Sequence, residues 1–128
     1  ENCHPAVKKY VSHPNEKVYD LLICKDVLEH IDEVTIPDVL EKFLRKSNQF
    51  FFTIPLGDND RFRIREYEVD ITHVTKKDEE WWINMFERNG FKLKEFRYNL
   101  GSIKEKWIPE HPYGNGFFIL ESVNDNTR

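Results

Sequence analysis

Short apolar runs alternate along this chain with longer segments of helical periodicity. Tyr19–Cys24, broken only by Asp20, and Gln49–Ile54 are apolar on both faces, which is typical of central strands in a parallel sheet. Phe91–Tyr98 alternates between apolar and polar positions with one interruption, as a half-exposed strand does. Phe117–Val123 is a further apolar run, so the pattern predicts four strands.

Residues 35–46 have the 3.6-residue period of an amphipathic helix. Thr35 and Asp38 resemble a capping box, and Pro37 suits the first turn of a helix. The apolar face consists of Val39, Leu40, Phe43 and Leu44. These features together predict a helix between the first two strands.

Residues 75–89 have the same period and predict a second helix. Thr75 and Asp78 are candidate caps at its start, and Gly90 suits the position just after its end. Its apolar positions are Trp81, Trp82, Met85 and Phe86. We expect the tryptophan pair to supply one core ring and one ring that lines a groove.

The order strand, helix, strand, helix, strand, strand predicts a single α/β domain over residues 1–128. Its sheet would hold parallel strands and a C-terminal antiparallel strand, with helices packed on the faces. Between the second strand and the second helix, residues 57–74 form a charged excursion that predicts a short helix or hairpin and, over 58–70, a solvated lid. Ligands of such sheets bind beyond the carboxyl ends of the strands, here Lys25–His30, Pro55–Asp60 and Asn99–Ser102.

Composition narrows the possible partners. The chain has 128 residues, of which 33% are charged, and its formal net charge is −4 with both signs interspersed. No basic stripe is present to bind nucleic acid, and no apolar segment approaches the roughly 20 residues of a membrane helix. The two cysteines, Cys3 and Cys24, lack metal-site spacing, so we expect reduced thiols and a cytoplasmic location.

Four ionisable side chains follow the Tyr19–Cys24 strand within six residues: Lys25, Asp26, Glu29 and His30. A carboxylate and an imidazole at the carboxyl end of a strand can hold a ligand or move a proton. The alternative is that these groups cap the following turn and face the solvent. Spacing by itself leaves both interpretations open.

His73 precedes the second predicted helix and lies near Asp70 in the sequence. It is a candidate base or substrate contact, and the alternative is a structural or exposed histidine. The other histidines stand next to prolines in loops and have no partner in the pattern. A zinc site requires closer ligand spacing than the sequence offers, so we expect no metal site. None of the five glycines opens a helix after a strand, so the chain has no glycine-rich phosphate loop.

The ordered series YDLLICKDVLEHI, amphipathic helix, FFFTIP and D-x-THVT followed by WW-x-x-x-F-x-x-x-GF resembles a known family. It is similar to the C-terminal two thirds of a class I S-adenosylmethionine-dependent methyltransferase of the small-molecule type. The resemblance covers residues 17–123 and implies a truncated Rossmann-like sheet that ends in an antiparallel hairpin. It also implies S-adenosylmethionine as the cofactor and methyl transfer to a small-molecule acceptor.

The resemblance assigns roles to particular residues. Cys24, Lys25, Asp26 and Val27 would lie beside the methionine part of the cofactor. His30 and His73 would be the candidate bases. Glu29, Leu56 and Asp58 would contact the acceptor, with the loop 56–60 and the segment around His73 as walls of its pocket.

The chain departs from the family pattern at its N-terminal side. The glycine-rich loop that follows the first strand in the family is missing. The acidic residue that follows the family's second strand and holds the cofactor ribose is missing as well. Without the family's first strand, the Tyr19–Cys24 strand would have a bare apolar edge, which is a pairing hazard. We therefore expect Lys8–Ser12 or a second copy of the chain to cover this edge.

Three functional hypotheses follow. The chain is a methyltransferase domain whose full-length form acts on a small molecule, or a non-catalytic remnant that has become a dimerising interaction module. The third hypothesis is a subunit whose partner supplies the glycine-rich loop. The sequence also leaves open whether the chain is a fragment of a longer protein.

Overall fold

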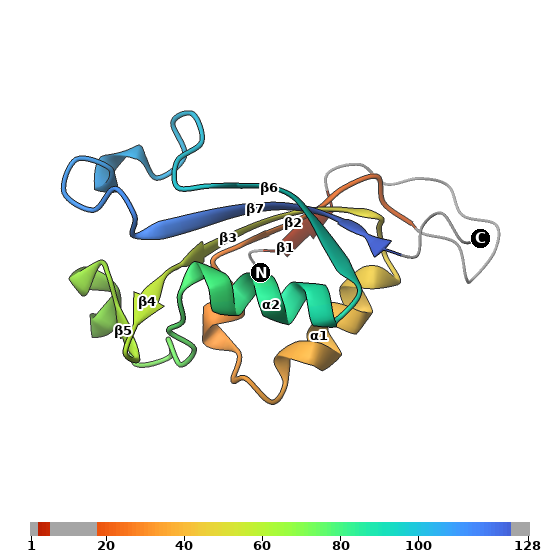
Figure 1. The fold of residues 1–128 in the computed structure, drawn as a ribbon, viewed down its shortest axis with the longest axis horizontal. Coiled ribbons are helices and arrows are strands. Elements are labelled where there is room, and N and C mark those ends of the chain that lie inside the picture. Colours follow the sequence, from red (N-terminus) through yellow and green to blue (C-terminus); the bar gives the residue numbers. More distant parts are fainter. Residues whose placement is uncertain (1–2, 6–17, 124–128) are drawn as a thin grey trace.

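A twisted five-stranded sheet with two helices forms the body of the molecule (Figure 1). The structure is a computed structural model, and it describes residues 3–5 and 18–123. The strand order is β1-β2-β3-β7-β6, in which β2 and β3 are parallel and the other neighbours are antiparallel. The strands are β1 (Cys3–Pro5), β2 (Leu22–Lys25), β3 (Gln49–Pro55), β6 (Phe91–Arg97) and β7 (Asn115–Ser122). This sheet, with parallel strands and an antiparallel C-terminal strand, confirms the predicted α/β architecture.

Both helices, α1 (Ile36–Leu44) and α2 (Glu79–Arg88), lie on the same side of the sheet (Figure 1). Alternate residues of β3 point towards them, so Phe50, Phe52 and Ile54 are fully buried, while Phe51 stacks on Phe117 on the opposite face. The core between helices and sheet comprises Leu22, Cys24, Leu28, Ile36, Leu40, Phe43, Phe50, Phe52, Ile54, Leu56, Trp82, Met85, Phe86, Phe91, Phe118 and Leu120. One core of aromatic and aliphatic side chains therefore packs both helices against β2, β3, β6 and β7.

The helix starts differ from their predictions. Thr35 makes no side-chain cap, and its own N–H instead donates to the Asp32 carboxylate at 3.2 Å, so the capping box is not formed. At α2 the cap is Asp78, which accepts from the Trp81 N–H at 2.9 Å, so the helix begins at Glu79 rather than at residue 75. Thr75 is buried and is used in a tertiary contact described below. The capping pattern in the sequence therefore located each helix start to within a few residues but did not identify the side chain that caps it.

The charged excursion contains both of the elements expected for it. Strands β4 (Gly57–Asp58) and β5 (Arg61–Phe62) form a hairpin, and a 3₁₀ helix spans Arg65–Val69. The hairpin turn is Asn59–Asp60, and both residues have positive φ, as a two-residue type I′ turn requires. Two further 3₁₀ turns, Leu28–His30 and Glu105–Trp107, follow β2 and β6. The interruption in the β6 alternation is a bulge between Leu93 and Glu95.

The edge of β2 is covered by β1, which pairs with it antiparallel and places Cys3 opposite Cys24. The predicted covering segment, Lys8–Ser12, lies outside the described residues. Cys24 takes part in a disulfide bond, so the prediction of reduced thiols is wrong. Directly opposed residues of antiparallel strands are close enough for a disulfide, and the spacing of the cysteines in the sequence gave no sign of that pairing.

Among the residues that the structure describes, no helix has the length and apolar character needed to cross a lipid bilayer.

Replacing Phe52 by Ala should destabilise the protein far more than the same change at Phe51. Phe52 is fully buried, and its ring lies within 5.9 Å of the rings of Phe43, Phe50, Phe86 and Phe91. We expect the Phe52→Ala change to lower the free energy of unfolding by about 3–5 kcal/mol, and the Phe51→Ala change to cost less than about half of that. Urea denaturation of both variants measures the difference, and equal losses would contradict the assignment of the core face.

Candidate functional site

Backbone hydrogen bonds join the two segments that carry the candidate catalytic residues. The carbonyl of Glu29 accepts the N–H groups of Val74 and Thr75 at 2.9 and 3.0 Å. The Thr75 hydroxyl donates to the Ile31 carbonyl at 2.6 Å. The turn after β2 is thereby held against the segment before α2, more than 40 residues further along the chain.

This contact brings His30 and His73 together. Their ring centroids are 4.4 Å apart, with the rings tilted by 50°. His73 is largely buried and its Nδ1 lies 2.7 Å from the Tyr67 carbonyl, whereas about a third of the His30 side chain is exposed. The sequence singled out both residues, and the structure places them in one site.

Glu29 lies beneath the two imidazoles. Its side chain is fully buried, and neither carboxyl oxygen has a hydrogen-bond partner. The His30 Nε2 is 3.6 Å from one of these oxygens. Burial, reinforced by repulsion from Asp26, raises the pKa of Glu29 from 4.5 to about 8. A buried carboxyl that titrates near neutrality is suited to proton transfer or to ligand binding.

Glu29, His30 and His73, called the Glu29 cluster below, are also grouped closely enough to hold a metal ion. Each offers one ligand atom, and these atoms all lie within 4.8 Å of one another. The expectation of no metal site rested on the wide spacing of histidines in the sequence. That spacing is irrelevant here, because the docking of residues 74–75 on Glu29 brings the two histidines together.

The four residues expected beside the cofactor have different surroundings. Cys24 is buried in the core and disulfide-bonded, Val27 packs against the core, and Lys25 is exposed. Asp26 has a positive φ of 56°, and its carboxylate accepts hydrogen bonds from the Lys104 ammonium at 2.5 Å and the Thr53 hydroxyl at 3.2 Å. The Asp26 carboxylate is therefore engaged by partners within the chain.

Lys104 is a site residue that the sequence gave no reason to select. It lies in the long loop between β6 and β7, and its side chain is only 9% exposed. Besides Asp26, its ammonium reaches Asn115 at 2.9 Å and the Tyr67 hydroxyl at 3.4 Å. Burial raises the pKa of Tyr67 to about 12, so the phenol stays protonated and donates to Asn115. Because its partners lie 11 to 78 residues away, no local pattern marks this lysine.

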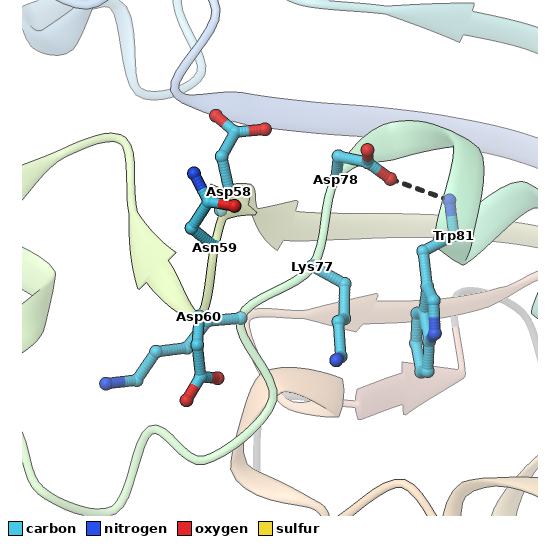
Figure 2. A pocket seen from close by; sticks show the side chains of 8 residues that line it. Asp58, Asn59, Asp60, Lys77, Asp78 and Trp81 are labelled. Carbon is cyan, nitrogen blue, oxygen red and sulfur yellow. Dashed lines mark hydrogen bonds between the residues drawn. The ribbon is translucent and has the colours of Figure 1, made fainter.

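The two expected acceptor contacts after β3 are not part of the Glu29 cluster. Leu56 is fully buried in the core. Asp58 accepts two hydrogen bonds from Arg63, at 2.7 and 3.0 Å, and these bonds lower the pKa of its carboxyl. It lines a separate pocket of about 430 Å³ between the β4–β5 hairpin and the start of α2, with Lys77, Asp78 and Trp81 on the other side (Figure 2).

The tryptophan pair of α2 divides as the sequence predicted. Trp82 is fully buried in the core, whereas Trp81 lines this pocket, so the prediction of one core ring and one groove-lining ring is confirmed.

Comparison with solved structures identifies the fold. Mitomycin 7-O-methyltransferase MmcR matches 83% of this chain with a TM-score of 0.60 and 13% identity. LepI in complex with S-adenosylmethionine matches 91% with a TM-score of 0.60 and 10% identity. An S-adenosylmethionine-dependent methyltransferase from Archaeoglobus fulgidus matches 87% with a TM-score of 0.56 and 14% identity. The chain therefore has a truncated form of the class I methyltransferase fold that its sequence resembles.

The match covers only part of these proteins. The chain spans 30% of MmcR, 28% of LepI and 62% of the Archaeoglobus protein. No protein-family model and no curated protein sequence matches the chain. At these identities the comparison establishes the fold alone.

Replacing Glu29 by Gln should flatten the dependence of stability on pH between about 4.5 and 8. The unfolded chain releases this proton near pH 4.5 and the folded chain near pH 8, so the stabilising contribution is full below 4.5 and is lost as the pH rises towards 8. We expect the difference in free energy of unfolding between wild type and Glu29→Gln to change by roughly 2–5 kcal/mol over this range. Urea denaturation in metal-free buffer measures it, with the exposed Glu87→Gln variant as control. Parallel curves for wild type and Glu29→Gln would contradict a buried, titrating carboxyl.

Replacing Lys104 by Met should destabilise the loop between β6 and β7. The change leaves the Asp26 and Asn115 oxygens without the ammonium that they share, at an expected cost of about 1–3 kcal/mol. Lys106→Met is the matched control, because that neighbouring lysine is exposed. Thermal unfolding compares the two variants, and an unchanged transition in Lys104→Met would show that the network does not stabilise the fold.

Proposed function

We propose that this chain is the acceptor-binding half of an S-adenosylmethionine-dependent methyltransferase that acts on a small molecule. The observation that best supports the proposal is the Glu29 cluster, in which a buried carboxyl without partners lies under two histidines at the carboxyl end of β2. On an α/β sheet this end of a parallel strand is the usual place for a ligand. The fold shared with methyltransferases directs the interpretation towards methyl transfer.

The cluster is suited to an acceptor that carries a proton to be removed. Methyl transfer to a hydroxyl or an amine places positive charge on the accepting atom, and a nearby group must take up the proton. Glu29, with a pKa of about 8, and the partly exposed His30 are positioned for this. His73 and the Tyr67 carbonyl that orients it would form the wall of the pocket. Positioning of the acceptor is the main contribution expected of these residues.

The residues of this chain fit only part of the cofactor. The turn from Cys24 to Val27 could lie beside its methionine end, with Lys25 exposed there. The chain has no glycine-rich loop after a strand and no matching acidic residue for the ribose, so we assign no transfer step to the chain by itself. Activity and acceptor are therefore proposed for the complete protein, of which a similar segment makes up under a third in MmcR and LepI.

A dimerising interaction module remains the second hypothesis. It was motivated by a bare edge on β2, and that edge is paired with β1 of the same chain. The outer side of β1 is a short edge of three residues that ends in Pro5, which is a poor template for a second chain. The expectation of a cytoplasmic location was based on reduced thiols. Cys24 is disulfide-bonded instead, and disulfides persist mainly in oxidising compartments.

Titration calorimetry with S-adenosylmethionine tests the proposal. We expect no heat at millimolar cofactor for residues 1–128, because the loop that would hold the cofactor carboxylate is missing. The product of the complete reading frame should bind the cofactor at micromolar concentration. Sedimentation of both proteins, run in parallel, reports their oligomeric state.

Each result discriminates between the hypotheses. Binding by the complete product, but not by residues 1–128, supports a methyltransferase whose cofactor site is completed elsewhere. Absence of binding by the complete product overturns the proposal and, with a dimer in sedimentation, favours the interaction module. Tight binding by residues 1–128 would show that the missing loop is not needed.

A further inference from the structure

We propose that Glu29, His30 and His73 bind a divalent transition-metal ion. Their three ligand atoms lie within 4.8 Å of one another and come from two segments that backbone hydrogen bonds hold together. Two imidazoles and one carboxylate are a donor set that suits ions such as Zn²⁺, Co²⁺ and Fe²⁺. The site is assigned from these side chains and does not depend on the proposed methyl transfer.

Hydrogen bonds fix the tautomer of His73. Its Nδ1 lies 2.7 Å from the Tyr67 carbonyl oxygen, which can only accept, so this nitrogen carries the proton. In the neutral imidazole the lone pair is then on Nε2. A histidine whose second nitrogen donates to a backbone carbonyl is the usual arrangement of a metal ligand.

His30 is oriented in the same way through a short relay. Asp70 Oδ1 accepts the Thr72 N–H at 2.9 Å and the Thr72 hydroxyl proton at 2.6 Å. The Thr72 hydroxyl oxygen, 2.9 Å from His30 Nδ1, must therefore act as acceptor, as must the Thr72 carbonyl at 3.2 Å. The free lone pair of His30 is consequently on Nε2, the atom that lies 3.6 Å from the Glu29 carboxyl.

Glu29 provides the independent sign of a ligand. Its carboxyl is completely buried, and both oxygens lack hydrogen-bond partners, an arrangement that costs free energy unless something else contacts them. A cation between Glu29 and the two imidazoles would supply that contact and neutralise the carboxylate. No other described side chain offers a hydrogen bond to these oxygens.

The geometry requires a modest contraction. Ligand atoms around a four-coordinate ion lie roughly 3–3.5 Å apart for bond lengths of about 2.0–2.2 Å, compared with the present limit of 4.8 Å. His30 is about one-third exposed and can rotate towards the ion, while Glu29 and His73 are packed in place. Three protein ligands leave at least one position open, as in catalytic rather than structural metal sites.

The open position suggests how the cluster would treat an acceptor, and this part rests on the proposed function. An acceptor hydroxyl bound there would release its proton to the solvent more readily, because a divalent cation lowers the pKa of oxygen ligands. The imidazoles would then act as ligands rather than as bases. The exposed side of His30 is the direction from which an acceptor can approach.

Titration of residues 1–128 with Co²⁺ tests the site without cofactor or activity, since the visible d–d absorption of bound cobalt reports nitrogen and oxygen ligands. We expect one Co²⁺ per chain, competed by Zn²⁺, and binding at least about tenfold weaker in Glu29→Gln, His30→Asn and His73→Asn. His111→Asn is the matched control, because His111 lies in the loop before β7, outside the cluster. Far-UV circular dichroism establishes that each variant is folded.

The outcomes separate cleanly. Loss of binding in the three cluster variants, with His111→Asn unchanged, supports the site. Absence of stoichiometric binding in wild type, or equal weakening in the control, overturns it. If Glu29→Gln fails to fold, His30→Asn decides, because that side chain is partly exposed and its loss spares the core. A positive result here, together with absence of cofactor binding by the complete product, would leave the metal site standing and overturn only the methyltransferase proposal.

Discussion

The candidate site depends on one backbone contact, the acceptance of the Val74 and Thr75 N–H groups by the Glu29 carbonyl. It fastens the end of the charged excursion to the turn that follows β2, and the Thr75 hydroxyl strengthens it through Ile31. Burial of the Glu29 side chain and the approach of His73 to His30 both follow from this docking. The reactive groups are thus positioned by peptide hydrogen bonds, which do not depend on their own side-chain chemistry.

A second set of long-range contacts, made by Lys104, lies at the same end of the sheet. The Lys104 ammonium reaches over the strand ends to Asp26 and Asn115, and so anchors the long loop between β6 and β7. The Lys104 charge also lowers the pKa of Glu29, but burial and repulsion from Asp26 outweigh this effect and hold that pKa at about 8.

The chain covers the edge of β2 with its own residues. Where a larger methyltransferase sheet would continue beyond β2, three residues of the same chain pair with the edge, and Cys24 is held by a disulfide. This arrangement protects the hydrophobic edge, but three residues do not replace the strand and loop that would approach a cofactor. The Glu29 cluster itself is assembled entirely from residues 29–73 of this chain, which the structure describes.

Local pattern in the sequence determined the elements and their order. The two apolar runs, the two amphipathic periods and Gly90 predicted β2, β3, α1 and α2 to within a few residues, because burial periodicity is a property of neighbouring positions. The stretch ending in Glu29 and His30, and the segment with His73, were also recognisable as candidate chemistry.

Only the tertiary structure decided what these residues do together. The contact between His30 and His73, the burial of Glu29 without a hydrogen-bond partner and the ion pair of Lys104 with Asp26 all depend on contacts across 42 to 78 residues. The same holds for the disulfide at Cys24 and for Thr75, which serves a long-range hydrogen bond instead of capping a helix. Such contacts form at the point where loops meet, and loop conformation is set by packing and hydrogen bonding between distant segments rather than by local propensity.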